Sequence, residues 1–172
     1  MVAQRVRSIR PVIAALLLAV PSGAQPKAPP RSPSSEDLAR QADVVLVGTV
    51  RELKSEWNAS RTQIVTRVTV AVDQYLKGGT AGNSFTLFVP GGEVGTVGEM
   101  YSHMPVFRRN EDVVVFAEKD PQNHFRVAGG RAGKLIVKKD PATGSPLVAG
   151  RQRLDDFVTS IRNTVEHPQL DR

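Results

Sequence analysis

The clearest pattern in the sequence is an alternation of apolar and polar residues over positions 64–75. Period two over ten residues, with many β-branched side chains, is typical of a β-strand that buries one face. In the segment 43–53, Asp43 is instead followed by four consecutive apolar residues, as in a strand buried on both faces. After the turn residues Lys77-Gly78-Gly79, Phe85, Leu87 and Val89 predict the inner face of a third strand. Gly48 within the first strand indicates a bulge or a close crossing of two backbones.

The rest of the chain predicts further short strands and two helices. The expected strands are 113–117, 124–128, 134–139 and 147–150. Ser34 or Ser35 is typical of a helix N-cap, with acidic residues in the first turn after it. Apolar residues at helical spacing predict an amphipathic helix over 151–165. We therefore expect an all-β fold, a five- to six-stranded OB-like barrel with a short N-terminal helix and a C-terminal amphipathic helix.

The first 35 residues have a different composition from the rest. Arginines precede the apolar run 12–20, and small residues follow it at 22–24, as in a secretory signal peptide. The run of about nine residues is too short to span a bilayer, which takes roughly 20. We expect residues 1–24 to be a cleaved signal peptide, 25–35 a proline-rich flexible tether, 36–166 one barrel domain with its C-terminal helix, and 167–172 a tail. The predicted location is the periplasm or the exterior of a bacterium, with no transmembrane segment after cleavage.

Charge and cysteine content limit the function classes. Cleavage would remove three of the 23 basic residues and none of the 17 acidic ones, which leaves a net charge of +3. Such a small charge, few aromatic residues and the predicted export argue against a nucleic-acid partner. The chain has no cysteine, which excludes disulfides, cysteine–zinc sites and thiol catalysis. An exported fold without disulfides is stabilised by packing alone.

Two short motifs resemble a known family. Ala42-Asp43-Val44-Val45 in the first strand and Tyr75-Leu76-Lys77-Gly78 after the second are similar to the N-terminal domain of tissue inhibitors of metalloproteinases and to netrin-like modules. The resemblance covers roughly residues 42–90 and implies an OB-type barrel. The chain also resembles small secreted bacterial proteins that carry V-P-G-G-E, here 89–93, and a Gly-Lys hairpin Thr-Gly pattern, here 133–144.

One departure from the inhibitor family concerns its mechanism. The family members chelate the protease zinc through an N-terminal cysteine, and this chain has a proline-rich segment and no cysteine there. The resemblance therefore implies the fold but not that inhibitory chemistry. No cofactor is expected.

The segment 90–110 is rich in glycine and interrupted by two prolines, which predicts a long loop. Loops of this length in compact domains are usually functional or disordered. Trp57, the only tryptophan, lies in a polar connector, where it would either anchor a partner or close one end of the barrel. Our expected function is a secreted, non-enzymatic module that binds another protein, such as an extracellular protease. The candidate contact residues are Trp57, Gly91, Gly92, Glu93, Glu99, Tyr101, His103 and Phe107.

Two alternatives remain open at this point. The chain could be an envelope-associated structural protein held by its N-terminal tether, or a metal-dependent enzyme that uses Glu93, Glu99 and His103. Two carboxylates and an imidazole on one loop could bind a divalent metal or transfer protons. Their spacing matches no metal or catalytic signature, and no G-x-S-x-G nucleophile elbow is present. Exposed polar loop residues are the simpler interpretation, so we expect no metal and no catalytic residue.

Overall fold

The computed structural model of the protein describes residues 32–79 and 82–167. The predicted signal peptide, most of the predicted tether and most of the tail lie outside the described residues. Within these ranges no helix combines the length and the apolar character needed to cross a membrane. The chain order of the elements is α1 Ser35–Gln41, β1 Val44–Trp57, β2 Ile64–Lys77, β3 Ser84–Pro90, β4 Gly92–Val94, β5 Val97–Glu99, β6 Asp112–Lys119, β7 Phe125–Val127, the 3-10 helix η1 Gly130–Gly133, β8 Lys134–Lys139, β9 Pro146–Val148, β10 Gln152–Arg153 and α2 Leu154–Glu166.

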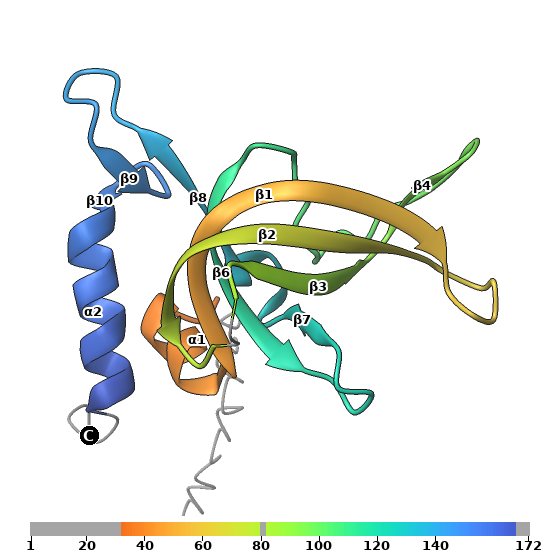
Figure 1. Cartoon of the computed structure of the whole chain (residues 1–172), viewed down its shortest axis with the longest axis horizontal. Helices are drawn as coiled ribbons and strands as arrows, with labels where there is room; N and C mark the ends of the chain where they lie inside the picture. Colours follow the sequence, from red (N-terminus) through yellow and green to blue (C-terminus); the bar gives the residue numbers. More distant parts are fainter. Residues whose placement is uncertain (1–31, 80–81, 168–172) are drawn as a thin grey trace, which may run out of the picture. The chain divides into compact units, whose positions relative to one another are not determined.

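Five strands form a closed barrel in the order β1-β2-β3-β7-β6, which β6 completes by pairing with β1 (Figure 1). The β3–β7 contact is parallel, with Phe88 opposite Arg126, and the other neighbours in the ring are antiparallel. This is the predicted OB-like barrel, with helices near both ends of the chain as expected. The sheet continues beyond the barrel through β8, β9 and β10, because β6 also pairs with β8.

Two apolar cores lie on opposite sides of the barrel wall. The interior core includes Val44 and Leu46 of β1, and the outer core includes Val45 and Val47 of the same strand. The four-residue apolar run that opens β1 is thus buried on both faces, as its sequence predicts. Strand β6 alternates in the same way between the two cores, so β6 and the first half of β1 are buried on both faces.

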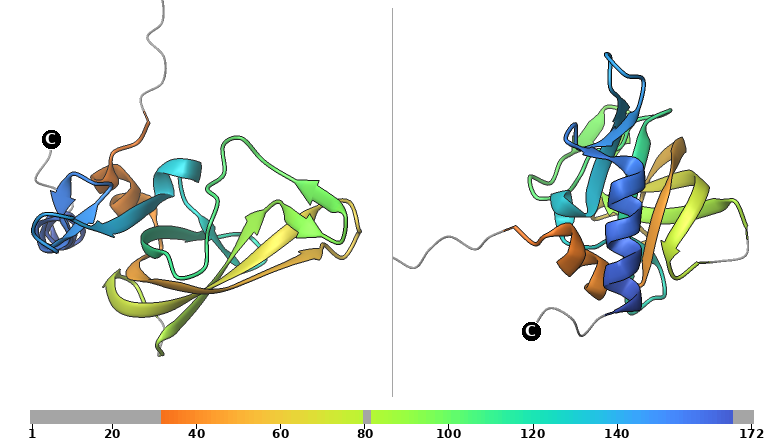
Figure 2. Two further views of the ribbon diagram at one scale, coloured as in Figure 1. Left: turned by 90° about the horizontal axis from the view of Figure 1, so that it is seen from above. Right: turned by 90° about the vertical axis from the view of Figure 1, so that its left-hand side faces the viewer.

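Both α-helices cover the outer core on the same side of the barrel (Figure 2). Ser34 caps α1 through a reciprocal capping box with Asp37, which confirms the predicted N-cap. Helix α2 begins at Leu154, three residues later than expected, because Gln152 and Arg153 pair with β9 as strand β10. Its buried residues Phe157, Val158 and Ile161 face the outer core.

The Leu-Lys-Gly turn after β2 has a structural role. Lys77 Nζ donates to the carbonyl oxygens of Ala39 and Arg40, each at 2.8 Å, at the C-terminus of α1. This is the helix end where a positive charge is stabilising. Burial lowers the pKa of Lys77, while the nearby Asp43 opposes the shift. Gly78 has a φ of +58°, and a Cβ there would lie 2.3 Å from the Asp43 carbonyl oxygen, so the turn requires glycine.

Gly48 marks both a bulge and a close backbone crossing. The β1–β2 register shifts between Val47 and Gly48, and a Cβ at Gly48 would lie 2.2 Å from the Ala71 carbonyl oxygen. The shift skips Asp73 on β2, so the extra residue of this bulge belongs to β2. Residues 45–49 of β1 pair with β2 on one edge and with β6 on the other.

We predict that Ile161→Ala lowers the free energy of unfolding by about 2–5 kcal/mol, because it empties part of the outer core. Urea denaturation of the protein measures the change. Asn163→Ala, on the exposed face of the same helix, is the matched control and should change stability by less than about 0.5 kcal/mol. Equal effects of the two substitutions would contradict the packing of α2 on the outer core.

Candidate functional site

The segment between β3 and β6 borders a cleft among the described residues. We call it the loop cleft, and its volume is about 630 Å³. Its walls come from β1, from the start of β2, from the end of β3 and from the segment itself. It is lined by Leu53, Ser55, Thr66, Val89, Pro90, Gly91, Gly92, Glu93, Gly98, Glu99, Met100, Tyr101, Met104, Pro105, Val106 and Phe107. Six of the eight candidate contact residues are thus brought together, while Trp57 and His103 are not among the lining residues.

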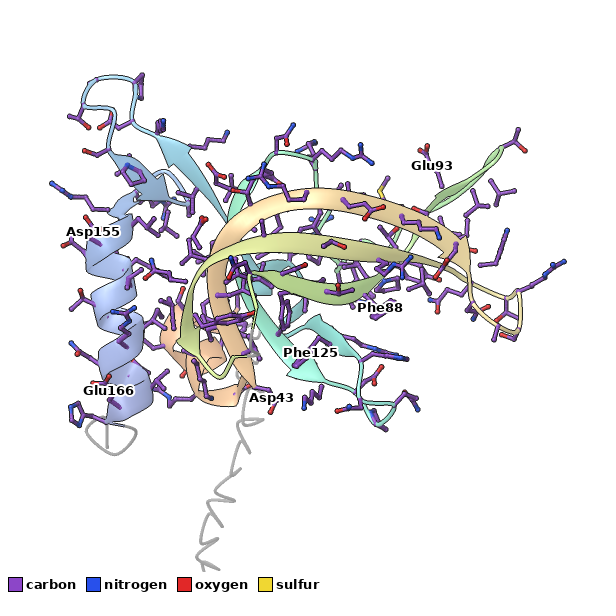
Figure 3. All side chains as sticks on the ribbon, in the orientation of Figure 1. Asp43, Phe88, Glu93, Phe125, Asp155 and Glu166 are labelled. Carbon is purple, nitrogen blue, oxygen red and sulfur yellow. The ribbon has the colours of Figure 1, made fainter. Side chains whose placement is uncertain are left out.

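The predicted long loop contains a short hairpin, because β4 pairs with β5 from Gly92–Glu99 to Val94–Val97. The hairpin carries Glu93 and extends away from the barrel (Figure 3). At its base, Gly91 and Gly92 have φ values of +97° and +132°. A Cβ at Gly92 would lie 2.3 Å from Thr66 Oγ1 and 2.4 Å from Ser55 Oγ. The paired glycines of the V-P-G-G-E pattern therefore let the hairpin leave the barrel in close contact with β1 and β2.

Glu99 and Tyr101 fasten this hairpin to the barrel. Glu99 Oε2 accepts a hydrogen bond of 2.9 Å from the backbone N–H of Ile64, the first residue of β2. Tyr101 Oη accepts at 2.9 Å from Gln63 Nε2 and donates at 3.4 Å to the same Glu99 oxygen. Two residues that the sequence offers as candidate chemistry are thus engaged in holding the loop.

Glu93 and His103 are separated from that anchor. Glu93 is exposed on β4, and the exposed His103 makes an edge contact with Tyr101, with ring centroids 6.4 Å apart. The His103 carbonyl oxygen accepts from the backbone N–H of Arg131 at 2.9 Å, which ties the loop to η1. In the part of the chain that the structure describes, no three histidine, aspartate or glutamate side chains gather into a set that could hold a metal ion.

A buried lysine that the sequence analysis did not select fixes the other end of the loop. Lys134 Nζ forms an ion pair with Glu111, donates to the Val106 carbonyl oxygen at 2.6 Å and lies 4.8 Å from the centroid of the Phe107 ring. The side chains of Lys134 and Glu111 are 5% and 12% exposed. The only sequence signal is a lysine that opens an apolar strand directly after Gly133. That glycine is itself required, since a Cβ there would lie 1.8 Å from the Ala128 carbonyl oxygen.

The same loop presents apolar side chains to solvent. Val97, Met100 and Val106 are 45%, 84% and 59% exposed, whereas Phe107 is buried in the interior core. They account for three of the four exposed large hydrophobic residues among those described. The site is therefore an anchored loop beside a cleft. We call the exposed side chains of Val97, Met100 and Val106 its apolar rim.

Trp57 is the fourth exposed large hydrophobic residue, at 36% exposed, and it lines a second hollow of about 390 Å³. We call this hollow the aromatic depression. Its lining residues are Glu56, Trp57, Asn58, Ala59, Gln63, Val65, Phe88, Pro90, Asp120, His124 and Arg126. Pro90 lines both hollows, so the aromatic depression adjoins the loop cleft but is distinct from it.

Asp120 organises one wall of the aromatic depression. Its Oδ1 accepts from the backbone N–H groups of Gln122 and His124, both at 2.9 Å, and its Oδ2 lies 2.9 Å from Arg126 Nε. Burial opposes ionisation of the Asp120 carboxyl. The hydrogen bond from His124, the charge of Arg126 and the hydrogen bond from Gln122 outweigh it, so the pKa of Asp120 lies below its usual value.

Comparison of the sequence with models of known protein families gave no match, and comparison with curated proteins gave none either. The resemblance to the metalloproteinase inhibitors and netrin-like modules therefore remains a prediction from sequence motifs. The arguments that follow depend on the residues and geometry of this chain.

We predict that Lys134→Met destabilises the protein by about 3–5 kcal/mol, because it leaves the Glu111 carboxylate buried without its partner. The double variant Lys134→Met with Glu111→Leu removes both charges and should be at least about 1 kcal/mol more stable than Lys134→Met alone. Chemical denaturation of the wild type, both single variants and the double variant measures the coupling. Strictly additive effects would show that the pair is not coupled.

We predict that Asp120→Asn makes stability less dependent on acid pH. The folded-state pKa of Asp120 is below the unfolded value of 3.8. Its ionised form therefore stabilises the fold above that pH, and the contribution is lost as the pH falls through the folded-state pKa. The urea midpoint should fall less between pH 6 and pH 3 in the variant than in the wild type. An equal fall in both proteins would contradict this role.

Proposed function

We propose that this chain is a secreted, non-enzymatic module that binds another protein through the loop cleft and its apolar rim, and that the partner is an extracellular protease. The observation that carries the proposal is the exposure of Val97, Met100 and Val106 on one loop. Large apolar side chains that gather on one exposed loop are typical of an interaction surface.

The anchoring of the loop supports the proposal. Hydrogen bonds to Glu99 and Tyr101 fix one end, and the Lys134–Glu111 ion pair fixes the other. A loop held in this way loses little conformational entropy when a partner binds, so more of the contact energy remains as affinity. Loops on a rigid barrel are also where binding residues are commonly found.

The choice of a protease depends on the resemblance of residues 42–90 to metalloproteinase inhibitors. This chain lacks the N-terminal cysteine of that family, so its contact would use a different surface. Met100, the most exposed large apolar residue described, is suited to fill an apolar pocket of the partner.

The test starts by using the exported form of the chain as bait in the parent organism's secreted fraction, and any recovered protease is purified. We predict that Met100→Ser with Val106→Ser weakens binding of that protease by about 2 kcal/mol, or about 30-fold in Kd. Calorimetry measures Kd, and a peptide-hydrolysis assay with and without the chain measures modulation of the protease.

Pro141→Ser with Ala142→Ser is the matched control, because these exposed residues lie in the separate β8–β9 turn. The control should bind as the wild type does. Unchanged binding by the Met100 and Val106 variant would refute the proposed contact surface. Recovery of no protease would refute the proposed partner.

A further inference from the structure

Three aromatic residues from separate segments line the aromatic depression. Trp57 ends β1, Phe88 lies on β3 (Figure 3) and His124 precedes β7. Alternate residues of β3 point into the barrel, and Phe85, Leu87 and Val89 belong to the interior core. Phe88 therefore lies on the outward face, where the core does not need it. Its ring centroid is 4.9 Å from that of His124.

The strand register places two arginines beside Phe88, and of these only Arg126 lines the depression. Phe88 is opposite Arg126 on β7 and opposite Arg67 on β2. The Arg126 Nε is paired with the 5%-exposed Asp120 carboxylate. The two terminal nitrogens of Arg126 have no hydrogen bond to any of the described residues, and the side chain is 59% exposed. Arg126 is thus held by a buried partner while its terminal donors remain available to a ligand.

The wall of the aromatic depression also carries negatively charged hydrogen-bond acceptors. Glu56 lines the depression with a half-exposed carboxylate whose Oε2 lies 3.8 Å from Lys54 Nζ. The charged lining residues therefore include two carboxylates, those of Glu56 and Asp120, and one guanidinium, that of Arg126. A polyanion such as single-stranded nucleic acid would need an excess of positive charge along its path. This depression does not provide it.

A neutral sugar fits these features better. A pyranose ring with equatorial hydroxyls has flat C–H faces that pack on aromatic rings, and each of its hydroxyls both donates and accepts hydrogen bonds. A hollow of this size that combines aromatic side chains with convergent polar groups is typical of a small-ligand site. We propose that the aromatic depression binds a neutral oligosaccharide, with a sugar ring against Trp57 and Phe88 and hydroxyls bound by Arg126 and Glu56.

The test uses Trp57 as its own probe, since it is the only tryptophan in the chain. Chitohexaose and cellohexaose are titrated into the exported form while tryptophan emission is recorded. Polygalacturonate and oligothymidylate are the anionic comparators. At least one neutral probe should give a saturable change that is unaffected between about 50 and about 500 mM salt, whereas binding of a polyanion would weaken steeply with salt.

Two conservative variants test the contact residues without emptying the core. Phe88→Leu keeps an apolar side chain but removes the ring, and Glu56→Gln keeps the shape but removes the charge. Each should weaken oligosaccharide binding about tenfold or more, with an unchanged far-UV circular dichroism spectrum. Met100→Ser is the matched control at the loop cleft and should bind the oligosaccharide as the wild type does.

Three results would overturn the proposal: no emission change with either neutral probe, salt-dependent binding of an anionic comparator only, or wild-type binding by Phe88→Leu. The outcome is independent of the proposed protein partner. A module that loses its protease in Met100→Ser with Val106→Ser, yet fails to bind any oligosaccharide, would retain the proposed function and lose this inference.

Discussion

The pairing of β1 with β6 is the constraint on which the rest of the fold depends. It closes the barrel from Val44–Ala117 to Thr49–Asp112, and most residues of the two paired segments are buried, on both faces. One pair of strands therefore supports the interior core and also the outer core beneath both helices. The helices and η1 pack on the outer core. They leave the loop cleft and the aromatic depression around Phe88 open to solvent.

The loop between β3 and β6 shows how an irregular segment is held without regular backbone pairing over most of its length. It is fastened at two ends by side chains, with Glu99 on the β2 backbone and Lys134 on the Val106 carbonyl. A buried polar group that loses its partner has a large free-energy cost, so such anchors restrict the loop to one arrangement. Its apolar residues can then be presented to solvent without being drawn into the core.

The strands and helices were largely predictable because each depends on local periodicity. Ile64, Val68 and Val70 are buried where their alternation predicts, and Ser34 caps α1. The β4–β5 hairpin was not foreseen, because its turn chemistry lies in a glycine-rich segment with little apolar signal. Contacts between residues far apart in the sequence are harder still to predict from it. Lys134 and Glu111 are 23 residues apart, and sequence periodicity indicates which face a side chain occupies but not which distant strand lies beside it.

The candidate site, too, could be predicted only in part from the sequence. Sequence reasoning found the glycine-rich loop, because composition alone marks it, but grouped Trp57 with it. The structure instead places Trp57 in the lining of the aromatic depression with Phe88 and Arg126, and only Pro90 lines both hollows. The two surfaces lie on one rigid barrel and do not overlap in their other lining residues, so both could be occupied at once. If both proposals hold, binding a glycan at the cell surface would raise the local concentration of the module near a partner there, and the protein-binding and envelope-associated interpretations would describe one mechanism.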